Sequence, residues 1–359
     1  MPDVEKRLEI ALRGAEEIIT VDELRSLIET GGGRGYLGFE PSGLFHIGWL
    51  IWAYKFGELI EAGFRMRLLA ATWHAWINDK LGGDLDLIRR ASDHVVHVLE
   101  ALGVSRSSYD LVYADQLASD PEYWSLVIRV AKSFSLARVR RALTIMGRMA
   151  DESESDFSKL IYPLMQVADI FYMDLDLALG GIDQRKAHML AREAAEKLKR
   201  KKIVAIHTPL LPSLTGPEKM VSNMERDDML SQIKMSKSKP EGAIFVYDTP
   251  EEIFSKIRKA YCPPREVEMN PIIGIARHII LRRGGTITIE RRPEHGGTME
   301  VTLEELEKLY TQGSIHPLDL KNAVAKRLVE ILEPIRRYFE GSKEAHEVLR
   351  MLRGSRFTR

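Results

Sequence analysis

The sequence has little cysteine, no long apolar segment and no net charge. Its single cysteine, Cys262, excludes an intramolecular disulfide and a metal site built on a cysteine cluster. No apolar run approaches the length of a membrane-spanning helix, and residues 1–6 lack the apolar core of a secretory signal. We therefore expect a cytoplasmic protein with no membrane contact. Because 52 basic residues balance 52 acidic ones, any RNA site must be a local basic patch.

The first 212 residues alternate apolar strands with amphipathic helices, within a chain of 359 residues that is long enough for two domains. This alternation predicts an α/β fold with a Rossmann-like, doubly wound parallel sheet. In such a sheet, ligands bind at the carboxyl ends of the strands. An N-terminal helix is expected over 4–19, and a second one starts at Thr20 and ends near Glu29. The expected strands are 36–39, 65–72, 109–113 and 203–206, and the main helices are 47–62, 84–102, 121–149, 158–172 and 183–199.

The rest of the chain changes character. Residues 213–245 are rich in Pro, Ser, Gly and charge, which is typical of a long functional loop or linker. Residues 246–359 are expected to form a separate, mostly α-helical domain. Its expected helices are 249–261, 271–282, 303–310, 317–339 and 343–352, with a small hairpin made of 286–290 and 298–301.

The stretch 41–49, with the sequence PSGLFHIGW, lies where the first central strand passes into a helix. A turn rich in Pro, Ser and Gly suits sharp backbone geometry, and Gly43 and Gly48 allow a ligand to approach closely. His46 stands at the helix start, where backbone N–H groups and the helix dipole attract phosphate. Taken alone, the stretch is also compatible with an ordinary strand-to-helix turn.

A second stretch, KMSKS at 234–238, lies in the irregular segment. Its two lysines, Lys234 and Lys237, and its two serines, Ser236 and Ser238, can clamp a polyphosphate, although a solvated basic loop has the same composition. The segment 219–222 repeats the pattern in part. We prefer 234–238 because it carries all five residues.

Three polar residues share one face of the apolar helix at 158–172. Tyr162, Gln166 and Asp169 are separated by four and three positions, so they lie on the same side of the helix. A polar stripe of this kind needs a buried polar partner, and an amino acid can supply one. The alternative is that Tyr162 and Gln166 satisfy each other and that Asp169 caps a helix or pairs with an arginine.

These stretches together resemble the class I aminoacyl-tRNA synthetases, and over nearly the full length the chain resembles the tyrosyl-tRNA synthetases of archaeal and eukaryotic type. Four blocks carry the resemblance. They are YLGFEPSG at 36–43, YPLMQVAD at 162–169, GGIDQRK at 180–186 and HPLDLKNA at 316–323. The resemblance implies ATP with Mg²⁺, L-tyrosine and tRNA(Tyr) as ligands, a homodimer, and no protein-bound transition metal. It also implies that the C-terminal domain binds the anticodon.

Roles for individual residues follow from the same resemblance. Tyr162, Gln166 and Gln184 would hold the α-amino group of tyrosine, and Tyr36 and Asp169 would bind its phenolic hydroxyl. Tyrosyl-tRNA synthetases are themselves the standard example of how such a pair rejects phenylalanine, with discrimination on the order of 10⁵. His74 resembles a residue that lines the amino-acid pocket, although a histidine between two tryptophans is as well explained by packing.

The resemblance implies a mechanism in two steps. The tyrosine carboxylate attacks the α-phosphorus of ATP and releases pyrophosphate, and a terminal ribose 2′-hydroxyl of the tRNA then attacks the tyrosyl-adenylate. Catalysis is expected from positioning and electrostatic stabilisation by His46, Lys234 and Lys237, with Gly43, Gly48, Ser236 and Ser238 completing the ATP site. The sequence departs from the usual signature at Trp49, where many class I enzymes have histidine.

For RNA, the resemblance marks Arg185 and Lys186 as readers of the first acceptor-stem base pair and Asp319 as a partner of the first anticodon base. His295 stands near a position where relatives place a stacking aromatic residue, and imidazole can stack on a base. Two further basic groups, one along 132–141 and one along 185–202, are also explained as solvated helix surfaces.

Three other functions compete with this interpretation. The first is a tryptophanyl-tRNA synthetase, against which the pair of Tyr36 and Asp169 argues. The second is a non-catalytic RNA-binding paralogue, which intact lysine and histidine signatures disfavour. The third is a small-molecule nucleotidyltransferase, which the lysine loop and the long helical C-terminal region disfavour.

Overall fold

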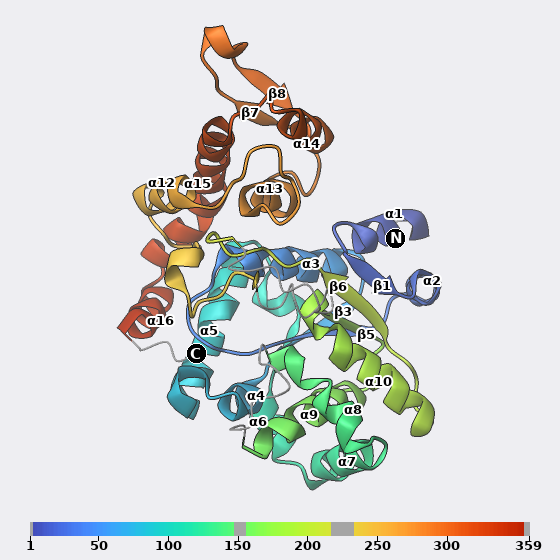
Figure 1. The fold of residues 1–359 in the computed structure, drawn as a ribbon. Coiled ribbons are helices and arrows are strands. Elements are labelled where there is room, and N and C mark those ends of the chain that lie inside the picture. The colour runs from blue at the N-terminus through green and yellow to red at the C-terminus, as the bar shows by residue number, and fades with distance from the viewer. Residues whose placement is uncertain (1–2, 147–155, 217–232, 355–359) are drawn as a thin grey trace.

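The computed structural model describes residues 3–146, 156–216 and 233–354. It has a six-stranded sheet flanked by helices, and a helical C-terminal region is stacked on one side of this body (Figure 1). The predicted Rossmann-like α/β fold is confirmed. No helix in the described ranges combines the length and the apolar character that a bilayer crossing needs. The strands are β1 (Glu17–Ile19), β2 (Arg34–Phe39), β3 (Arg65–Ala70), β4 (Asp110–Tyr113), β5 (Leu177–Gly181) and β6 (Val204–Thr208).

The strand order is β1-β6-β5-β2-β3-β4, with β1 antiparallel to β6 and all other pairs parallel. The chain runs outwards from β2 through β3 to β4 and then returns to the other side of β2 as β5. The order therefore reverses between β2 and β5, which is where doubly wound sheets bind their ligands. The carboxyl ends of these two strands lead into Glu40 and into the turn Ile182–Gln184.

The helices of this part are α1 (Val4–Leu12), α2 (Val21–Glu29), α3 (Leu50–Glu61), α4 (Thr72–Ile77), α5 (Leu85–Ala101), α6 (Ala114–Ala118), α7 (Pro121–Lys132), α8 (Leu136–Arg140), α9 (Ser158–Tyr172) and α10 (Arg185–Lys197). They form one hydrophobic core on each face of the sheet, because alternate residues of a strand point to opposite sides. In β2, Leu37 and Phe39 enter the core that includes α3, whereas Tyr36 enters the core that includes α7 and α9. This alternation turns Tyr36 towards α9.

Two predicted helices are corrected. The helix expected over 4–19 ends at Leu12, because Gly14 takes a left-handed backbone conformation (φ 62°) and 17–19 then pair with β6 as β1. The region expected to be helical over 121–149 is divided into α7, α8 and a short 3₁₀ turn, Leu143–Met146. Ser135 accepts a hydrogen bond from the Arg138 N–H and so starts a new helix. Residues 147–149 lie outside the described ranges.

The strand β5 was not predicted from the sequence, and β3 ends at Ala70, two residues earlier than predicted. The segment LALGG of β5 is short and contains two glycines, so its strand propensity is low. Its extended conformation is stabilised by parallel pairing with β2 on one side and β6 on the other. The chain leaves β3 at Ala70, and the tryptophan-rich residues that follow form α4.

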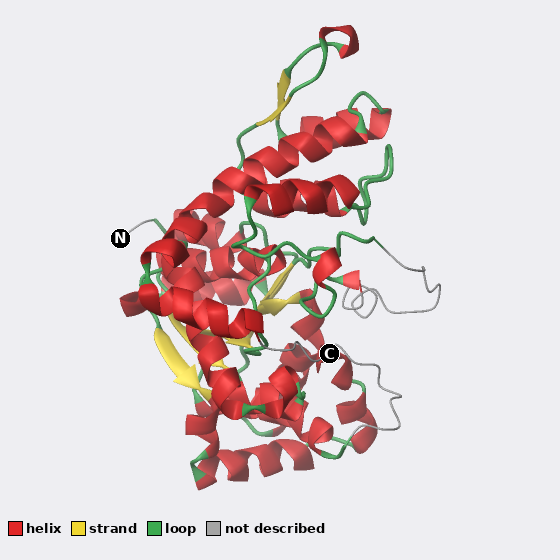
Figure 2. Cartoon of the chain, turned by 90° about the vertical axis from the view of Figure 1, so that its left-hand side faces the viewer, coloured by secondary structure: helices red, strands yellow, loops and turns green. Residues whose placement is uncertain are grey.

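The C-terminal region contains α12 (Pro250–Lys259), α13 (Pro271–Ile275), a π-helical turn (Ala276–Ile280), α14 (Leu303–Gln312), α15 (Pro317–Gly341), α16 (Lys343–Gly354), and the strands β7 (Ile287–Ile289) and β8 (Met299–Val301). The expected helices and the antiparallel hairpin are confirmed here. Local capping explains the agreement, since Thr249 and Thr302 each form a capping box. Figure 2 shows the hairpin strand apart from the main sheet, at the end of the helical region. The last helix, α16, returns to pack against α5 of the sheet-containing body.

Candidate functional site

A cleft lies at the carboxyl ends of β2 and β3, and its empty volume, with the open solvent at its mouth included, is about 300 Å³. Its lining brings together residues from β2, α4, α9 and the turn after β5. The lining residues are Tyr36, Gly38, Phe39, Glu40, Leu69, Ala71, His74, Tyr162, Gln166, Asp169 and Gln184. All six residues that the sequence analysis assigned to a tyrosine site therefore face one cleft.

Asp169 is the buried acidic group of this cleft, with 1% of its surface exposed. Its Oδ1 accepts a hydrogen bond of 2.7 Å from the Tyr123 hydroxyl, and its Oδ2 lies 3.2 Å from His74 Nε2. The expected alternatives, a helix cap or an arginine pair, are not what this carboxylate forms. Burial, and then the nearby Asp169, raise the pKa of Tyr36, so its hydroxyl stays protonated and can donate.

The polar stripe of α9 is satisfied by the turn after β5. Gln166 Nε2 donates to Gln184 Oε1 at 3.3 Å, and Gln184 Nε2 donates to the carbonyl of Ile145 at 3.2 Å. Among the described residues, Gln166 Oε1 is buried without a hydrogen-bond partner, which leaves one acceptor available to a ligand. The Tyr162 ring stands edge-on to His74, with 4.9 Å between the ring centroids. Tyr162 and Gln166 therefore do not simply satisfy each other.

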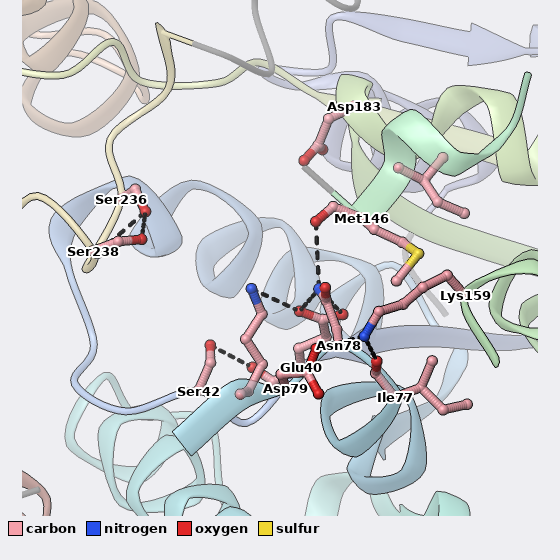
Figure 3. A network of polar contacts seen from close by, with 12 residues as sticks. Glu40, Ser42, Ile77, Asn78, Asp79, Met146, Lys159, Asp183, Ser236 and Ser238 are labelled. Atoms are coloured by element: carbon pink, nitrogen blue, oxygen red, sulfur yellow. Dashed lines mark hydrogen bonds and ion pairs between the residues drawn. The ribbon is translucent and has the colours of Figure 1, made fainter. Parts of the chain in front are cut away.

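Glu40 adds a carboxylate that the sequence analysis did not assign to the site. Figure 3 shows it at the centre of a polar network, where the amide of Asn78 donates to its two oxygens at 3.0 and 3.1 Å. Lys80 Nζ lies 3.7 Å from the same carboxylate. Burial, and then Glu40, raise the pKa of Tyr162. A half-buried carboxylate held in this way can neutralise a ligand ammonium.

The first signature occupies the predicted strand-to-helix turn. Gly43 has φ 112°, a conformation that favours glycine, and His46 precedes a 3₁₀ turn (Ile47–Trp49) that leads into α3. His46 is buried, and its Nδ1 has no hydrogen-bond partner in the part of the chain that the structure describes. A Cβ at Gly48 would lie 3.0 Å from that nitrogen, so the glycine leaves room for the imidazole. Burial, and then Lys237 and Lys234, lower the pKa of His46, which keeps the ring neutral.

The second signature lies beside the first. Lys234 forms an ion pair with Asp183 on the turn after β5, and the hydroxyls of Ser236 and Ser238 are 2.9 Å apart. The ammonium of Lys237 lies 3.7 Å from the centre of the Trp49 ring. The alternative segment 219–222 lies outside the described residues.

Backbone hydrogen bonds join the first signature to the segment that follows the second. The Ile47 N–H donates to the Ile244 carbonyl at 2.9 Å, and the Val246 N–H donates to the Phe45 carbonyl at 3.1 Å. His46 and Phe245 therefore form an antiparallel bridge. The segment after the lysine loop is thus a direct neighbour of the turn that carries His46.

Comparison with known proteins agrees with this arrangement. The family model described as "tRNA synthetases class I (W and Y)" matches residues 31–333. A tyrosine–tRNA ligase of Aeropyrum pernix is 58% identical over 356 residues, which is 98% of each chain. The chain belongs to the tyrosyl-tRNA synthetases. A tyrosine–tRNA ligase of Saccharolobus islandicus is 57% identical, with 97% of this chain and 98% of that one aligned.

Solved structures of two archaeal tyrosyl-tRNA synthetases have the same fold. The structure from Aeropyrum pernix aligns with a TM-score of 0.86 at 53% identity and covers 98% of this synthetase and 99% of that chain. The structure from Pyrococcus horikoshii, which is described as complexed with L-tyrosine, aligns with a TM-score of 0.89 at 43% identity. It covers 97% of this chain and 100% of that one.

The predicted RNA-contacting residues of this synthetase lie in two separate places. Arg185 begins α10 and forms an ion pair with Glu17 of β1, with 2.9 Å between Nε and Oε2. Lys186 follows it on the same helix. Asp319 lies in the first turn of α15, and His295 ends a short 3₁₀ turn between β7 and β8. Several other basic residues of the two further groups also form ion pairs with glutamates, namely Arg138, Arg192, Lys197 and Lys202.

Two contributors to the cleft were missed from the sequence, and their signals differ. Glu40 follows a central parallel strand directly, and a carboxylate at that edge is a signal that could have been used. Tyr123 lies on α7, 46 positions from Asp169 in the sequence, on the apolar face of an amphipathic helix. Nothing local distinguishes it from a core tyrosine.

Proposed function

We propose that the cleft binds L-tyrosine and that the two signatures bind ATP, so that this chain catalyses tyrosine activation and the charging of tRNA(Tyr). The observation that carries the proposal is the cleft itself, which joins Asp169 and Tyr36 with Glu40 beside His46 and the lysine loop. A phenol needs a buried hydrogen-bonding pair, and an ammonium needs a carboxylate. The cleft lining offers both.

In this proposal the substrate lies between the two polar groups of the cleft. Tyr36 donates to the phenolic oxygen and Asp169 accepts the phenolic proton, while Glu40, Tyr162, Gln166 and Gln184 hold the ammonium. His74 Nε2 lies 3.2 Å from the other oxygen of Asp169. Because the Tyr123 hydroxyl already holds Asp169, the acceptor is in place before the substrate arrives, which lowers the cost of ordering it.

The chemistry needs charge stabilisation rather than a covalent enzyme intermediate. A carboxylate oxygen of tyrosine forms a bond to the α-phosphorus of ATP, and the bond from that phosphorus to the bridging oxygen breaks as pyrophosphate leaves. His46 is neutral and acts as a hydrogen-bond donor to phosphate, whereas Lys234 and Lys237 supply positive charge to the displaced oxygens. In the second step the ribose 2′-hydroxyl attacks the adenylate carbonyl, and AMP leaves. Gly43, Gly48, Ser236 and Ser238 shape the nucleotide site.

We propose that Mg²⁺ enters with ATP. Mg²⁺ keeps several waters and prefers phosphate oxygens over an all-protein cage. Within the described ranges, no group of three or more His, Cys, Asp or Glu side chains is placed to hold a metal ion. In this proposal the phosphate oxygens of ATP are the main ligands of the metal.

The proposal includes tRNA contacts at both places described above. Arg185 and Lys186 would meet the acceptor end close to the cleft, and Asp319 and His295 would meet the anticodon in the helical C-terminal region. The division into a catalytic domain (1–212), a loop (213–245) and an anticodon-binding domain (246–359) belongs to the same proposal. A cytoplasmic location stays a prediction from composition.

We also propose a homodimer. Large apolar side chains are exposed on neighbouring elements, namely Ile128 on α7, Leu136 on α8 and Phe157 just before α9, with exposed fractions of 58, 62 and 75%. A second copy of the chain would cover them. Sedimentation equilibrium should give twice the chain mass for the wild type and a shift towards monomer for Ile128→Glu; a monomeric wild type would contradict the proposal.

The decisive experiment is amino-acid-dependent exchange between ATP and pyrophosphate, with tyrosine, tryptophan and phenylalanine in parallel. We expect exchange with tyrosine alone. Exchange with tryptophan would reject the role of Tyr36 and Asp169 but keep the reaction class. No exchange with any of the three would favour an RNA-binding paralogue.

A further inference from the structure

Trp49 occupies the fourth position of the first signature and faces the second lysine of the lysine loop. The Lys237 ammonium lies 3.7 Å from the centre of the indole ring, within the range of a strong cation–π contact. Only 8% of Lys237 is exposed, and its Nζ makes no hydrogen bond in the described part of the chain. A buried ammonium without an acceptor is costly, so the ring supplies its main favourable contact.

The charged groups near Lys237 do not explain its position. Burial lowers the pKa of Lys237 well below its ordinary value, repulsion by Lys80 lowers it further, and attraction by Glu40 raises it in part. Glu40 is already engaged by Asn78 and Lys80. The indole face is negative without carrying a charge, so it holds a cation without competing for the groups that surround the cleft.

The Trp49 ring is itself fixed by other aromatic side chains. Phe45 and Phe39 meet it edge-to-face, with centroid separations of 5.3 and 6.3 Å, and Trp52 packs against it at 5.7 Å. The His46 ring lies 5.7 Å away on the same turn. Phe45 is also hydrogen-bonded through its backbone to Val246. The aromatic cluster around Trp49 is therefore attached to the segment that follows the lysine loop.

We propose that Trp49 is a positioning residue that holds Lys237 beside His46 until the phosphates of ATP take over its ammonium. An imidazole at this place would offer a smaller ring and could become positive, whereas an indole stays neutral and is the best aromatic partner for a cation. The transfer of the Lys237 ammonium from the indole ring to the phosphates is favourable, because phosphate oxygens accept hydrogen bonds and carry a full negative charge, whereas the ring does neither. The inference rests on the proposed role of Lys237 in binding ATP.

The test compares Trp49→Met with Trp49→Phe, since methionine keeps apolar bulk without a ring face. Because the contact is released as ATP binds, its loss acts through preorganisation: without the ring face, the Lys237 side chain must be ordered during binding, at a cost of about 0.5–1.5 kcal/mol. We therefore expect kcat/KM for ATP in pyrophosphate exchange to fall roughly 3- to 10-fold in Trp49→Met and less than about 2-fold in Trp49→Phe, which keeps a ring face. KM for tyrosine should change by less than about 2-fold in both. Trp52→Met is the matched control, because Trp52 packs in the same aromatic cluster whereas the Lys237 ammonium lies over the ring of Trp49, and it should retain wild-type KM for ATP.

A double-mutant cycle separates positioning from packing. If Trp49 acts through Lys237, Trp49→Met should have less than about a 2-fold effect in a Lys237→Ala background. Equal effects in both backgrounds, an equal loss in Trp52→Met, or no difference between Trp49→Met and Trp49→Phe would each overturn the inference. Failure of the proposed function is distinguishable, because the wild type itself would then show no tyrosine-dependent exchange.

Discussion

At the scale of single residues, the cleft is defined by two carboxylates with different surroundings. Asp169 is buried and receives a hydrogen bond from a tyrosine hydroxyl, whereas Glu40 is half-buried and receives two hydrogen bonds from an amide. The hydrogen bonds to both carboxylates come from neutral donors, and Glu40 also lies 3.7 Å from the Lys80 ammonium. The two are therefore suited to different ends of a zwitterionic, phenolic substrate.

Glu40→Gln should weaken tyrosine binding through the ammonium. Losing a charged hydrogen bond of about 1.5–3 kcal/mol predicts a rise in KM for tyrosine of roughly 10- to 100-fold, with KM for ATP nearly unchanged. Glu61→Gln, on the exposed end of α3, is the control. As a second readout, 3-(4-hydroxyphenyl)propionate, which lacks the amino group, should inhibit Glu40→Gln at least as well as wild type. Equal weakening for both ligands would show that Glu40 does not face the ammonium.

Tyr123→Phe should impair selectivity without touching the substrate. Asp169 would lose the 2.7 Å hydrogen bond that orients it, at a cost of about 0.5–1.5 kcal/mol, so kcat/KM for tyrosine should fall roughly 3- to 10-fold. Asp169→Asn removes the charge itself and should cost more and reduce the preference for tyrosine over phenylalanine. Exchange assays with both amino acids measure this, and an unchanged preference in Asp169→Asn would contradict the assignment.

At the scale of elements, the edge of the sheet carries a buried histidine pair. His188 Nδ1 and His207 Nε2 are 3.0 Å apart, and His207 Nδ1 lies 2.9 Å from Glu17 Oε2, so β1, β6 and α10 meet there. Burial, and then repulsion by Arg185, lower the pKa of His207 to about 4. The pair thus joins the edge strand to the helix that carries Arg185.

The low pKa of His207 predicts that the contact between β1, β6 and α10 stabilises the fold less at acidic pH. The folded-state pKa of His207 is about 4 and its ordinary value is 6.5, so protons bind the unfolded chain more tightly and destabilise the fold as pH falls. The contribution is complete above about pH 6.5 and is lost on the way to pH 4. The difference between the two pKa values corresponds to roughly 3 kcal/mol. Urea unfolding at pH 7 and pH 4 should show a smaller loss for His207→Asn than for wild type; the same loss in both would contradict this origin.

The accuracy of prediction from sequence also differs between elements. The C-terminal helices were predictable because their starts carry local signals, as the capping boxes at Thr249 and Thr302 show. The strands β1 and β5 were not, since each is stabilised by neighbours far away in the sequence. The polar stripe on α9 could be read from spacing, but its partners Tyr123 and Gln184 depend on how α7 and β5 pack, which local patterns do not encode.

At the scale of the whole molecule, a buried charge cluster joins the N-terminal helix, α3 and the C-terminal region. The Glu58 side chain is fully buried and lies 3.3 Å from Lys55 Nζ, 3.4 Å from Arg13 and 2.7 Å from Arg282. Lys55 also donates to carbonyl oxygens of α1, and burial lowers its pKa to about 8. One carboxylate therefore compensates cations from three parts of the chain.

Glu58→Gln should destabilise the protein strongly. Removing one partner of a buried ion pair leaves uncompensated cations and typically costs about 3–5 kcal/mol. Glu330→Gln breaks an exposed pair with Arg327 and should cost less than about 1 kcal/mol. Guanidinium unfolding midpoints compare the two variants. Similar midpoints would mean that the Glu58 cluster does not stabilise the contact between the N-terminal helix, α3 and the C-terminal region.

The pairing of 45–47 with 244–246 has a consequence for synthesis. A ribosome makes the first signature long before it makes the segment that hydrogen-bonds to it. Until residue 246 has left the exit tunnel, the turn around His46 lacks its backbone partner, and the nascent chain exposes an incomplete nucleotide pocket. Nascent chains halted at residue 212 should therefore be more readily cleaved by protease near residue 46 than chains released at full length.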